Sequence, residues 1–238
     1  MSVWDAGPIV VGHRGGRGVG WPPENTLAAF DRARSQGARA VELDARTCAG
    51  GDVVVVHDAT LSVRDGRRVA DVDAAELRAF GVPLLEEVLS WARACGVAVN
   101  VEMKHDVDDG AQLVRGTLGA VRATRADVLL SSFDPRLLAQ AAARAPALPR
   151  ALLVRARQPL WAHVIERLAR PPLVAWLHLE RPQASPRAVE GALRRGLRLG
   201  VWTVNRPEDA VDLVRLGAQS IITDVPGAVL DALALTRS

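Results

Sequence analysis

The strongest constraint on the fold of this chain is a regular alternation between short apolar runs and longer amphipathic segments. The short runs are rich in Val, Ile and Leu and favour β-strands, whereas the longer segments have the length of helices. Such an alternation predicts a parallel sheet covered by helices, either open or closed into a barrel. Strands are predicted at Ile9–Val11, Ala40–Asp44, Val53–His57, Ala98–Met103, Val128–Ser131, Ala151–Val154, Leu173–Leu179, Leu199–Val204 and Ser220–Thr223. Helices are predicted near Thr26–Gln36, Pro83–Cys95, Ala111–Arg122, Pro135–Ala145, Pro159–Leu168, Pro186–Arg195, Pro207–Leu216 and Pro226–Leu235.

The segment Ala40–His57 departs from this alternation, because no helix fits between its two apolar runs. Its middle is rich in glycine, which predicts a turn and an antiparallel hairpin. Pairing Thr47 with Val54 would set the register of this hairpin. That register would place His57 opposite Asp44, at the level where the preceding strand ends.

Nine predicted strands are one more than a closed eightfold barrel needs, and the return strand of the hairpin accounts for the extra one. The remaining eight are parallel, and no linker or low-complexity tract divides the chain. We therefore predict a (β/α)8 TIM barrel that forms a single domain over residues 1–238. Residues 45–82 are predicted to form a β-hairpin and a short excursion, inserted after the second barrel strand.

Composition excludes several other classes of protein. Of the 238 residues, 49% are hydrophobic and 24% are charged, which suits a large buried core and excludes a disordered chain. No apolar run approaches the ~18 residues of a membrane-spanning helix. Residues 1–16 lack a basic region ahead of an apolar run, so no signal peptide is expected. Two cysteines, Cys48 and Cys95, are too few for a disulfide framework, which favours a cytoplasmic location.

The charge pattern favours a solvated, arginine-rich surface over a face that binds nucleic acid. The formal net charge is only +3, since 30 basic residues face 27 acidic ones, and the arginines are scattered. Of the 30 basic residues, 29 are arginine and the remaining one is Lys104. A single lysine in so arginine-rich a chain suggests a position that requires a compact ammonium group. The sequence leaves the oligomeric state open.

Acidic side chains lie near the ends of two predicted strands. Glu42 and Asp44 are two residues apart and so share one face of their strand, as do Glu102 and Lys104 on another. Charges on buried strands require an opposite charge or a metal ion. Three carboxylates with no cysteine cluster favour Mg²⁺ or Ca²⁺ over zinc. The alternative is a set of ion pairs with Lys104 or Arg14 that needs no metal.

Two histidines and two cations complete the candidate site. His13 follows the first strand and His57 ends the return strand, a pair suited to the exchange of protons with a substrate. Arg14, in a glycine-flanked turn, and Lys104 could together bind an anionic group such as phosphate. Trp202 is either an aromatic wall of the substrate site or part of the core.

The motifs at these positions resemble those of the glycerophosphodiester phosphodiesterase family, in the same order and from about Ile9 to Pro226. The matching motifs are G-H-R-G-G, P-P-E-N-T-L-A-A-F, V-E-L-D, V-V-V-V-H-D, V-N-V-E-M-K, S-S-F, V-W-T-V-N and I-I-T-D-V-P. One departure is Ala49–Gly51, where the family usually has an Asp-Gly turn. The short excursion resembles that of compact cytoplasmic members.

The resemblance implies a TIM barrel that hydrolyses glycerophosphodiesters to sn-glycerol 3-phosphate and an alcohol with one bound divalent cation. The residues it implies are listed by role: metal ligands Glu42, Asp44 and Glu102; general base and general acid His13 and His57; phosphate contacts Arg14 and Lys104; and a substrate-facing Trp202. Three alternatives stay open. They are a lysophospholipase D-like activity on single-chain lipids, a non-catalytic phosphodiester-binding barrel, and a Schiff-base barrel with Lys104 as nucleophile.

Overall fold

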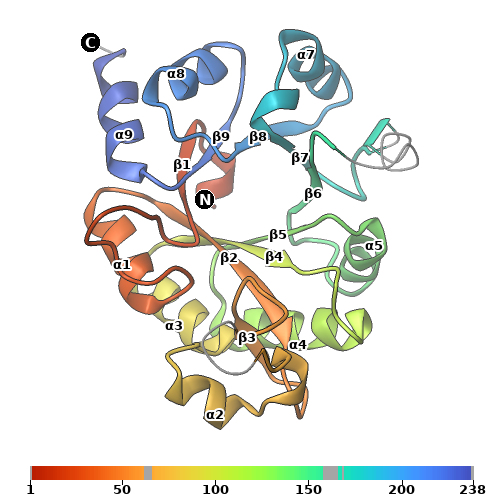
Figure 1. The fold of residues 1–238 in the computed structure, drawn as a ribbon. Coiled ribbons are helices and arrows are strands. Elements are labelled where there is room, and N and C mark those ends of the chain that lie inside the picture. The colour runs from red at the N-terminus through yellow and green to blue at the C-terminus, as the bar shows by residue number, and fades with distance from the viewer. Residues whose placement is uncertain (1, 62–65, 158–165, 168, 237–238) are drawn as a thin grey trace.

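Eight parallel strands close into a barrel in the computed structural model, which describes residues 2–61, 66–157, 166–167 and 169–236 (Figure 1). The barrel strands are β1 (Ile9–His13), β2 (Ala40–Thr47), β4 (Ala98–Met103), β5 (Val128–Ser132), β6 (Arg150–Val154), β7 (Trp176–Glu180), β8 (Arg198–Trp202) and β9 (Ser220–Thr223). Each strand pairs in parallel with its neighbours, and β1 closes the ring by pairing with both β2 and β9. This confirms the predicted TIM barrel.

Helices cover the outside of the barrel, as the alternation predicts (Figure 1). They are α1 (Leu27–Ser35), α3 (Leu85–Cys95), α4 (Gly110–Thr124), α5 (Pro135–Arg144), α7 (Pro186–Arg194), α8 (Pro207–Arg215) and α9 (Pro226–Leu235). Four of these begin with a proline, which suits the first helical turn because its missing N–H has no partner there. The helix predicted at Pro159–Leu168 falls outside the described residues except for 166–167. Among the described residues, no helix is long and apolar enough to cross a bilayer.

The extra strand β3 (Val53–Val55) pairs antiparallel with β2, which confirms the hairpin. The predicted register is wrong by one residue, because Thr47 pairs with Val53. The cause is the turn: the Cys48 N–H donates to the carbonyl of Asp52 at 3.0 Å, which leaves three residues in the loop.

Two consecutive glycines make this longer turn accessible. Gly50 and Gly51 have φ values of 85° and 93°, a region that side chains with a Cβ rarely adopt. The shifted register brings Val56 opposite Asp44 in β2, and the Val56 N–H donates to the Asp44 carbonyl at 2.9 Å. His57 therefore lies one residue beyond the predicted position and outside the regular strand.

The excursion after the hairpin has a small core of its own. Its helix α2 (Ala74–Ala79) is not predicted from the sequence, and Figure 1 shows it at the lower edge of the view. Buried apolar side chains of the excursion pack together: Cys48, Val54, Leu61, Val69, Val72 and Leu77. The described part of the excursion also contains the short 3-10 helix η2 (Val69–Asp71). This packing fixes the segment that carries His57.

The barrel interior is apolar at one end and polar at the other. Trp4, in the 3-10 helix η1 (Val3–Asp5), meets Trp176 edge to face with ring centroids 6.3 Å apart. These rings pack with small and branched side chains from most of the strands: Ile9, Val11, Ala40, Ala98, Leu129, Ala151 and Ile222. Residues two positions further along each strand share this inward face, so they surround the carboxyl end of the barrel.

Candidate active site

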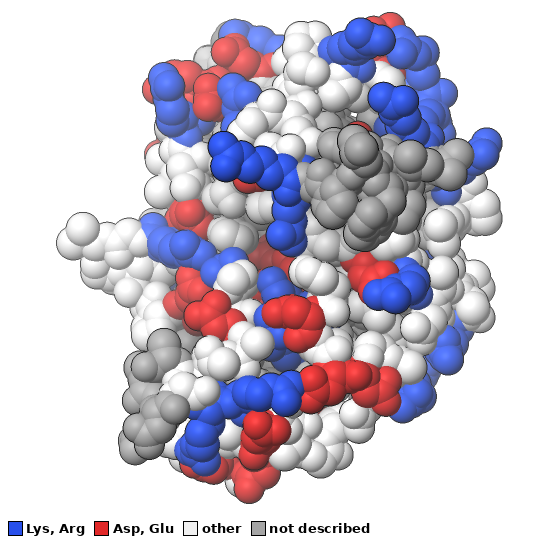
Figure 2. All heavy atoms as spheres, turned by 45° about the vertical axis from the view of Figure 1, so that its right-hand side comes forward, with Lys and Arg blue, Asp and Glu red and all other residues white. Residues whose placement is uncertain are grey.

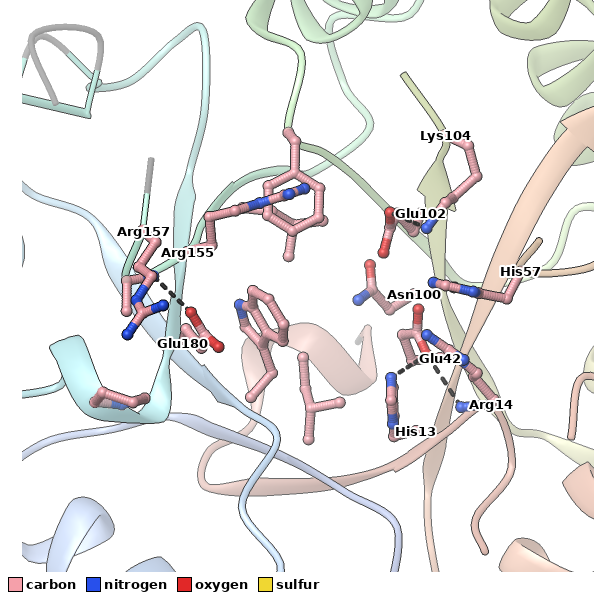
Figure 3. A pocket seen from close by; sticks show the side chains of 16 residues that line it. His13, Arg14, Glu42, His57, Asn100, Glu102, Lys104, Arg155, Arg157 and Glu180 are labelled. Carbon is pink, nitrogen blue, oxygen red and sulfur yellow. Dashed lines mark hydrogen bonds and ion pairs between the residues drawn. The ribbon is translucent and has the colours of Figure 1, made fainter. Parts of the chain in front are cut away.

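A cavity of about 750 Å³ opens at the carboxyl end of the barrel strands (Figure 3). One side carries mostly charged residues from β1, β2 and β4 and the loops that follow: His13, Arg14, Glu42, His57, Asn100, Glu102 and Lys104. The other side carries aromatic, apolar and charged residues from β6, β7 and β8 and from the segments after β5, β6 and β7: Phe133, Leu153, Arg155, Arg157, Glu180, Pro182 and Trp202. Basic and acidic side chains lie interspersed on the face of the molecule shown in Figure 2. Seven of the eight sequence-predicted site residues line this one cavity, and Asp44 lies behind its wall.

Three carboxylates converge at the charged side. One oxygen from each of Glu42, Asp44 and Glu102 lies within 4.8 Å of the others, and all three residues are buried. The sheet register explains this convergence. Asp44 is the direct neighbour of Glu102 across β2 and β4, and Glu42 is the neighbour of Asn100. All four positions have inward parity, so the fold places the acids around one point.

Burial and mutual repulsion make the ionisation of this cluster unequal. Burial raises the pKa of Glu42 well above its usual range, and the charges of Asp44 and Glu102 raise it further. Burial and the charge of Asp44 also raise the pKa of Glu102. Burial opposes ionisation of Asp44 too, but Lys104 and Arg14 outweigh it and lower the pKa of that carboxyl. Holding all three carboxyls ionised at once is therefore unfavourable unless further positive charge lies close to them.

Two cations already contact the cluster. The Lys104 Nζ lies 2.9 Å from Glu102 Oε1 and 3.3 Å from Asp44 Oδ1, and the Arg14 Nε lies 3.0 Å from Asp44 Oδ2. The ion pairs considered from the sequence are thus present. Within the described residues, Glu42 accepts a hydrogen bond from the Arg14 backbone N–H at 3.0 Å and has no arginine or lysine side chain at ion-pair distance. Within the described residues, two permanently charged cations contact three carboxyl groups, so a further cation at this point would be stabilised by the cluster.

Lys104 is held in its charged form. Burial disfavours its ammonium, but the carboxylates of Glu102 and Asp44 outweigh burial and raise the pKa of Lys104. A Schiff-base nucleophile must be a neutral amine. The surroundings of Lys104 therefore argue against a Schiff-base barrel.

The donor set fits a divalent cation. Glu42, Asp44 and Glu102 offer hard oxygen ligands of the kind that Mg²⁺ and Ca²⁺ prefer. The Asn100 amide lines the cavity beside them, and neither its Oδ1 nor its Nδ2 has a hydrogen-bond partner within the described residues. A buried amide without partners is costly, and a ligand or ion at this point would satisfy it.

His13 is held by a residue that the sequence analysis does not single out. Its Nδ1 lies 2.7 Å from Oδ1 of Asp224, and its Nε2 lies 3.9 Å from Oε2 of Glu42. The Nε2 atom thus faces the acidic cluster (Figure 3). The Asn205 Nδ2 donates to the other Asp224 oxygen at 2.7 Å and fixes that carboxylate. Ser220, Ile222 and Asp224 are two positions apart along one strand direction, so Asp224 shares the inward face of the other two. This spacing is the sequence signal that could have identified it.

His57 reaches the cavity from the excursion. Its Nδ1 lies 2.7 Å from Oδ1 of Asp58, and about a third of its side chain is exposed. Its backbone carbonyl accepts a hydrogen bond from the Arg46 Nε at 2.8 Å, and Arg46 is paired in turn with Asp106 at 2.9 Å. These contacts fix the segment that follows β3. His57 therefore lines the cavity even though the hairpin register differs from the predicted one.

The wall opposite the acids is aromatic and basic, and most of it is not predicted from the sequence. Trp202 lines the cavity, and its Nε1 donates to the His178 carbonyl at 3.1 Å. Its ring meets Phe133 edge to face, with centroids 5.6 Å apart. Arg155 places its guanidinium 4.2 Å from the centroid of the Phe133 ring. His178, in β7, is fully buried and is not among the residues that line the cavity.

Comparisons with known proteins agree with this geometry. The model of the glycerophosphoryl diester phosphodiesterase family matches residues 13–228. A glycerophosphodiester phosphodiesterase from Caldanaerobacter subterraneus is 30% identical over 241 residues, which cover 94% of this chain and 96% of that protein.

Solved structures show the same barrel. The glycerophosphodiester phosphodiesterase of Thermotoga maritima superposes with a TM-score of 0.74 at 26% identity, covering 94% of this chain and 96% of its own. A phosphodiesterase of Oleispira antarctica, solved in complex with the product sn-glycerol-3-phosphate, superposes with a TM-score of 0.84 at 24% identity. That likeness covers 98% of this chain and 100% of the other, and it concerns the fold.

Proposed function

The chain belongs to the glycerophosphoryl diester phosphodiesterase family, and from this membership we propose metal-dependent hydrolysis of glycerophosphodiesters to sn-glycerol 3-phosphate and an alcohol, with His13 and His57 exchanging the protons. Membership confirms the resemblance seen in the motifs and makes the protein a phosphodiester hydrolase. The metal, the roles of the two histidines and the substrate contacts are our proposal.

The proposed metal ligands are Glu42, Asp44 and Glu102, holding one Mg²⁺ or Ca²⁺. The support is their convergence within 4.8 Å, and the fact that the three carboxyl groups outnumber the two cations, Arg14 and Lys104, that contact them within the described residues. When bound, the cation would supply positive charge that stabilises the charge developing on the phosphate during substitution at phosphorus.

His13 is the proposed general base. Donation of its Nδ1–H to Asp224 leaves Nε2 as the proton acceptor on the cavity side. Nε2 would take the proton of the glycerol hydroxyl next to the phosphate, and that oxygen would attack phosphorus to give a cyclic phosphate. Direct attack by water, deprotonated by the same atom, uses the same residues.

His57 is the proposed general acid. It would protonate the departing alcohol oxygen as the bond to phosphorus breaks. When water opens the cyclic phosphate, His57 would take a proton from that water and His13 would return its proton to the glycerol oxygen that leaves phosphorus. Its place on the cavity wall, exposed enough to exchange protons with solvent, supports this role.

Arg14, Lys104 and Trp202 are proposed to bind the substrate. Arg14 and Lys104 line the cavity beside the acids, so their charges can contact phosphate oxygens as well as carboxylates. Trp202 would pack against the apolar surface of the glycerol or the alcohol.

Two further proposals concern the whole chain. We take residues 1–238 as one domain, because the sheet closes only when β9 pairs with β1. We propose a cytoplasmic location, because Cys48 and Cys95 are both unpaired.

The observation that carries the proposal is the acidic cluster with an imidazole on either side of it at one cavity. The test is release of sn-glycerol 3-phosphate from a glycerophosphodiester, measured with EDTA and again after Mg²⁺ or Ca²⁺ is restored. The same assay with a lysolipid as substrate tests the lysophospholipase D-like alternative. If no diester releases a product, a non-catalytic phosphodiester-binding barrel is favoured.

A further inference from the structure

Two arginines line the cavity wall that faces the acidic cluster. Arg155 and Arg157 follow β6 on the inward face, and Figure 3 shows both across the cavity from Glu42 and Glu102. Within the described residues, neither guanidinium has a carboxylate at ion-pair distance. This differs from Arg14 and Lys104, whose charges are already engaged by the acids.

One acidic residue lies on the same wall, and the backbone holds it. Glu180 accepts a hydrogen bond from the Ala156 N–H at 2.5 Å through Oε2. Counting Arg155, Arg157 and Glu180 as charged leaves one net positive charge on this part of the wall. A bound group that met both arginines would therefore meet a positive field.

One of the aromatic rings nearby already carries a cation. The guanidinium of Arg155 lies 4.2 Å from the centroid of the Phe133 ring, so a cation already occupies one face of that ring. The Trp202 ring meets Phe133 edge to face, and its Nε1 is bonded to the His178 carbonyl. A quaternary ammonium at this point would meet Arg155 and be repelled.

We propose that the preferred leaving alcohol carries an anionic group, a carboxylate or a phosphate, which Arg155 and Arg157 bind. The inference rests on the proposed function, since it places the reacting phosphate at the acidic cluster and one of its substituents against the far wall. Glycerol is uncharged, so a negative group at the arginines must belong to the alcohol that leaves. Guanidinium groups suit both carboxylate and phosphate, because their paired donors match two oxygens at once.

The test uses pairs of substrates that differ by one anionic group. Glycerophosphoserine differs from glycerophosphoethanolamine by a carboxylate, and glycerophosphoinositol 4-phosphate differs from glycerophosphoinositol by a phosphate. We expect kcat/KM to favour the anionic member of at least one pair by about tenfold to hundredfold. The two pairs distinguish a carboxylate from a phosphate, and the preference should shrink as the salt concentration rises.

Variants of the two arginines test whether they cause the preference for an anionic alcohol. Arg155→Gln and Arg157→Gln keep a polar side chain but remove the charge, and each should bring the kcat/KM ratio closer to one. The double variant should remove most of the preference. Arg187→Gln is the matched control, because Arg187 is exposed on α7, away from the cavity lining, and this change should leave the ratio as in the wild type.

The outcomes separate this inference from the proposed function. Failure to hydrolyse any diester with metal present would overturn both. Hydrolysis of all four diesters with ratios near one, or with a preference for ethanolamine over serine and for unphosphorylated inositol, would overturn the inference alone. A preference that survives in the double variant would also contradict it.

Discussion

The Nδ1 atom of His13 lies 2.7 Å from Oδ1 of Asp224, although 211 positions separate the two residues in the chain. The two residues meet because β1 and β9 pair to close the barrel, so closure of the sheet also orients the imidazole. The hydrogen bond from His13 helps to lower the pKa of Asp224, against the opposing effect of burial. An ionised Asp224 selects the tautomer in which Nε2 of His13 faces the cavity without a proton.

Replacing Asp224 with Asn should therefore lower kcat while the fold persists. The Asn205 amide donates to one Asp224 oxygen, so the new side chain would turn its carbonyl toward Asn205 and its NH₂ toward His13. That orientation favours the wrong tautomer, with the proton on Nε2, and kcat should fall by about 10²–10⁴-fold. Steady-state kinetics check this, with the exposed Asp212→Asn as the matched control. Wild-type kcat in the Asp224 variant would show that the pair does not set the tautomer.

His13→Ala and His57→Ala should each lower kcat by about 10²–10⁴-fold, since each removes one proton-transfer group. Neither change should cost much stability, because neither ring belongs to the apolar core and about a third of the His57 side chain is exposed. Kinetics and urea unfolding separate the two effects. His105→Ala is the control, since His105 is not among the residues that line the cavity. Near-normal turnover in either cavity variant would contradict its assigned role.

Removing divalent cations should abolish activity, and Mg²⁺ or Ca²⁺ should restore it. Binding should also raise the melting temperature, because a cation bound by the folded chain alone stabilises it by mass action. Glu42→Gln keeps the shape of the side chain but removes a carboxylate, so its melting temperature should respond much less to the metal. Differential scanning fluorimetry over a metal titration checks this without an activity assay. Full activity after exhaustive chelation would refute the metal site.

The alternation and parity of the sequence predict the barrel and the convergence of the acids. Positions two apart share a face, so an inward Ala40 makes Glu42 and Asp44 inward, and in-register pairing with β4 brings Glu102 to the same point. These relations depend on strand geometry alone. That is why they can be predicted without a structure.

Other features depend on details that the pattern does not carry. The hairpin register depends on whether its turn holds two residues or three, and glycines permit either. Arg155 and Glu180 are single charges at strand ends, where solvated surface residues are equally common. Asp224 follows the same inward parity as the acids. Its role depends on its hydrogen bond to His13, and that contact forms only when β9 pairs with β1 to close the barrel. The helix α2 has only six residues, which is too short for a helical periodicity to be recognised in the sequence.

A buried histidine should make the stability of the fold depend on pH. His178 is fully buried, and neither ring nitrogen has a hydrogen-bond partner within the described residues. Burial lowers its pKa to about 3, whereas an exposed histidine has a pKa of about 6.5. Above pH 6.5 the ring is neutral in both states and its titration contributes nothing. Between these pH values only the unfolded chain binds the proton, so falling pH favours unfolding.

The expected loss is about 1.4 kcal/mol per pH unit below pH 6.5, or about 2 kcal/mol between pH 7 and pH 5. His178→Leu removes the titrating group, and its packing cost does not depend on pH. The difference in unfolding free energy between wild type and variant should therefore shift by about 2 kcal/mol toward the variant over this range. Urea unfolding at pH 7, 6 and 5 measures the shift, and the subtraction removes the contribution of carboxylates common to both proteins. A difference that stays constant with pH would mean that His178 takes up a proton in the folded barrel as readily as in the unfolded chain.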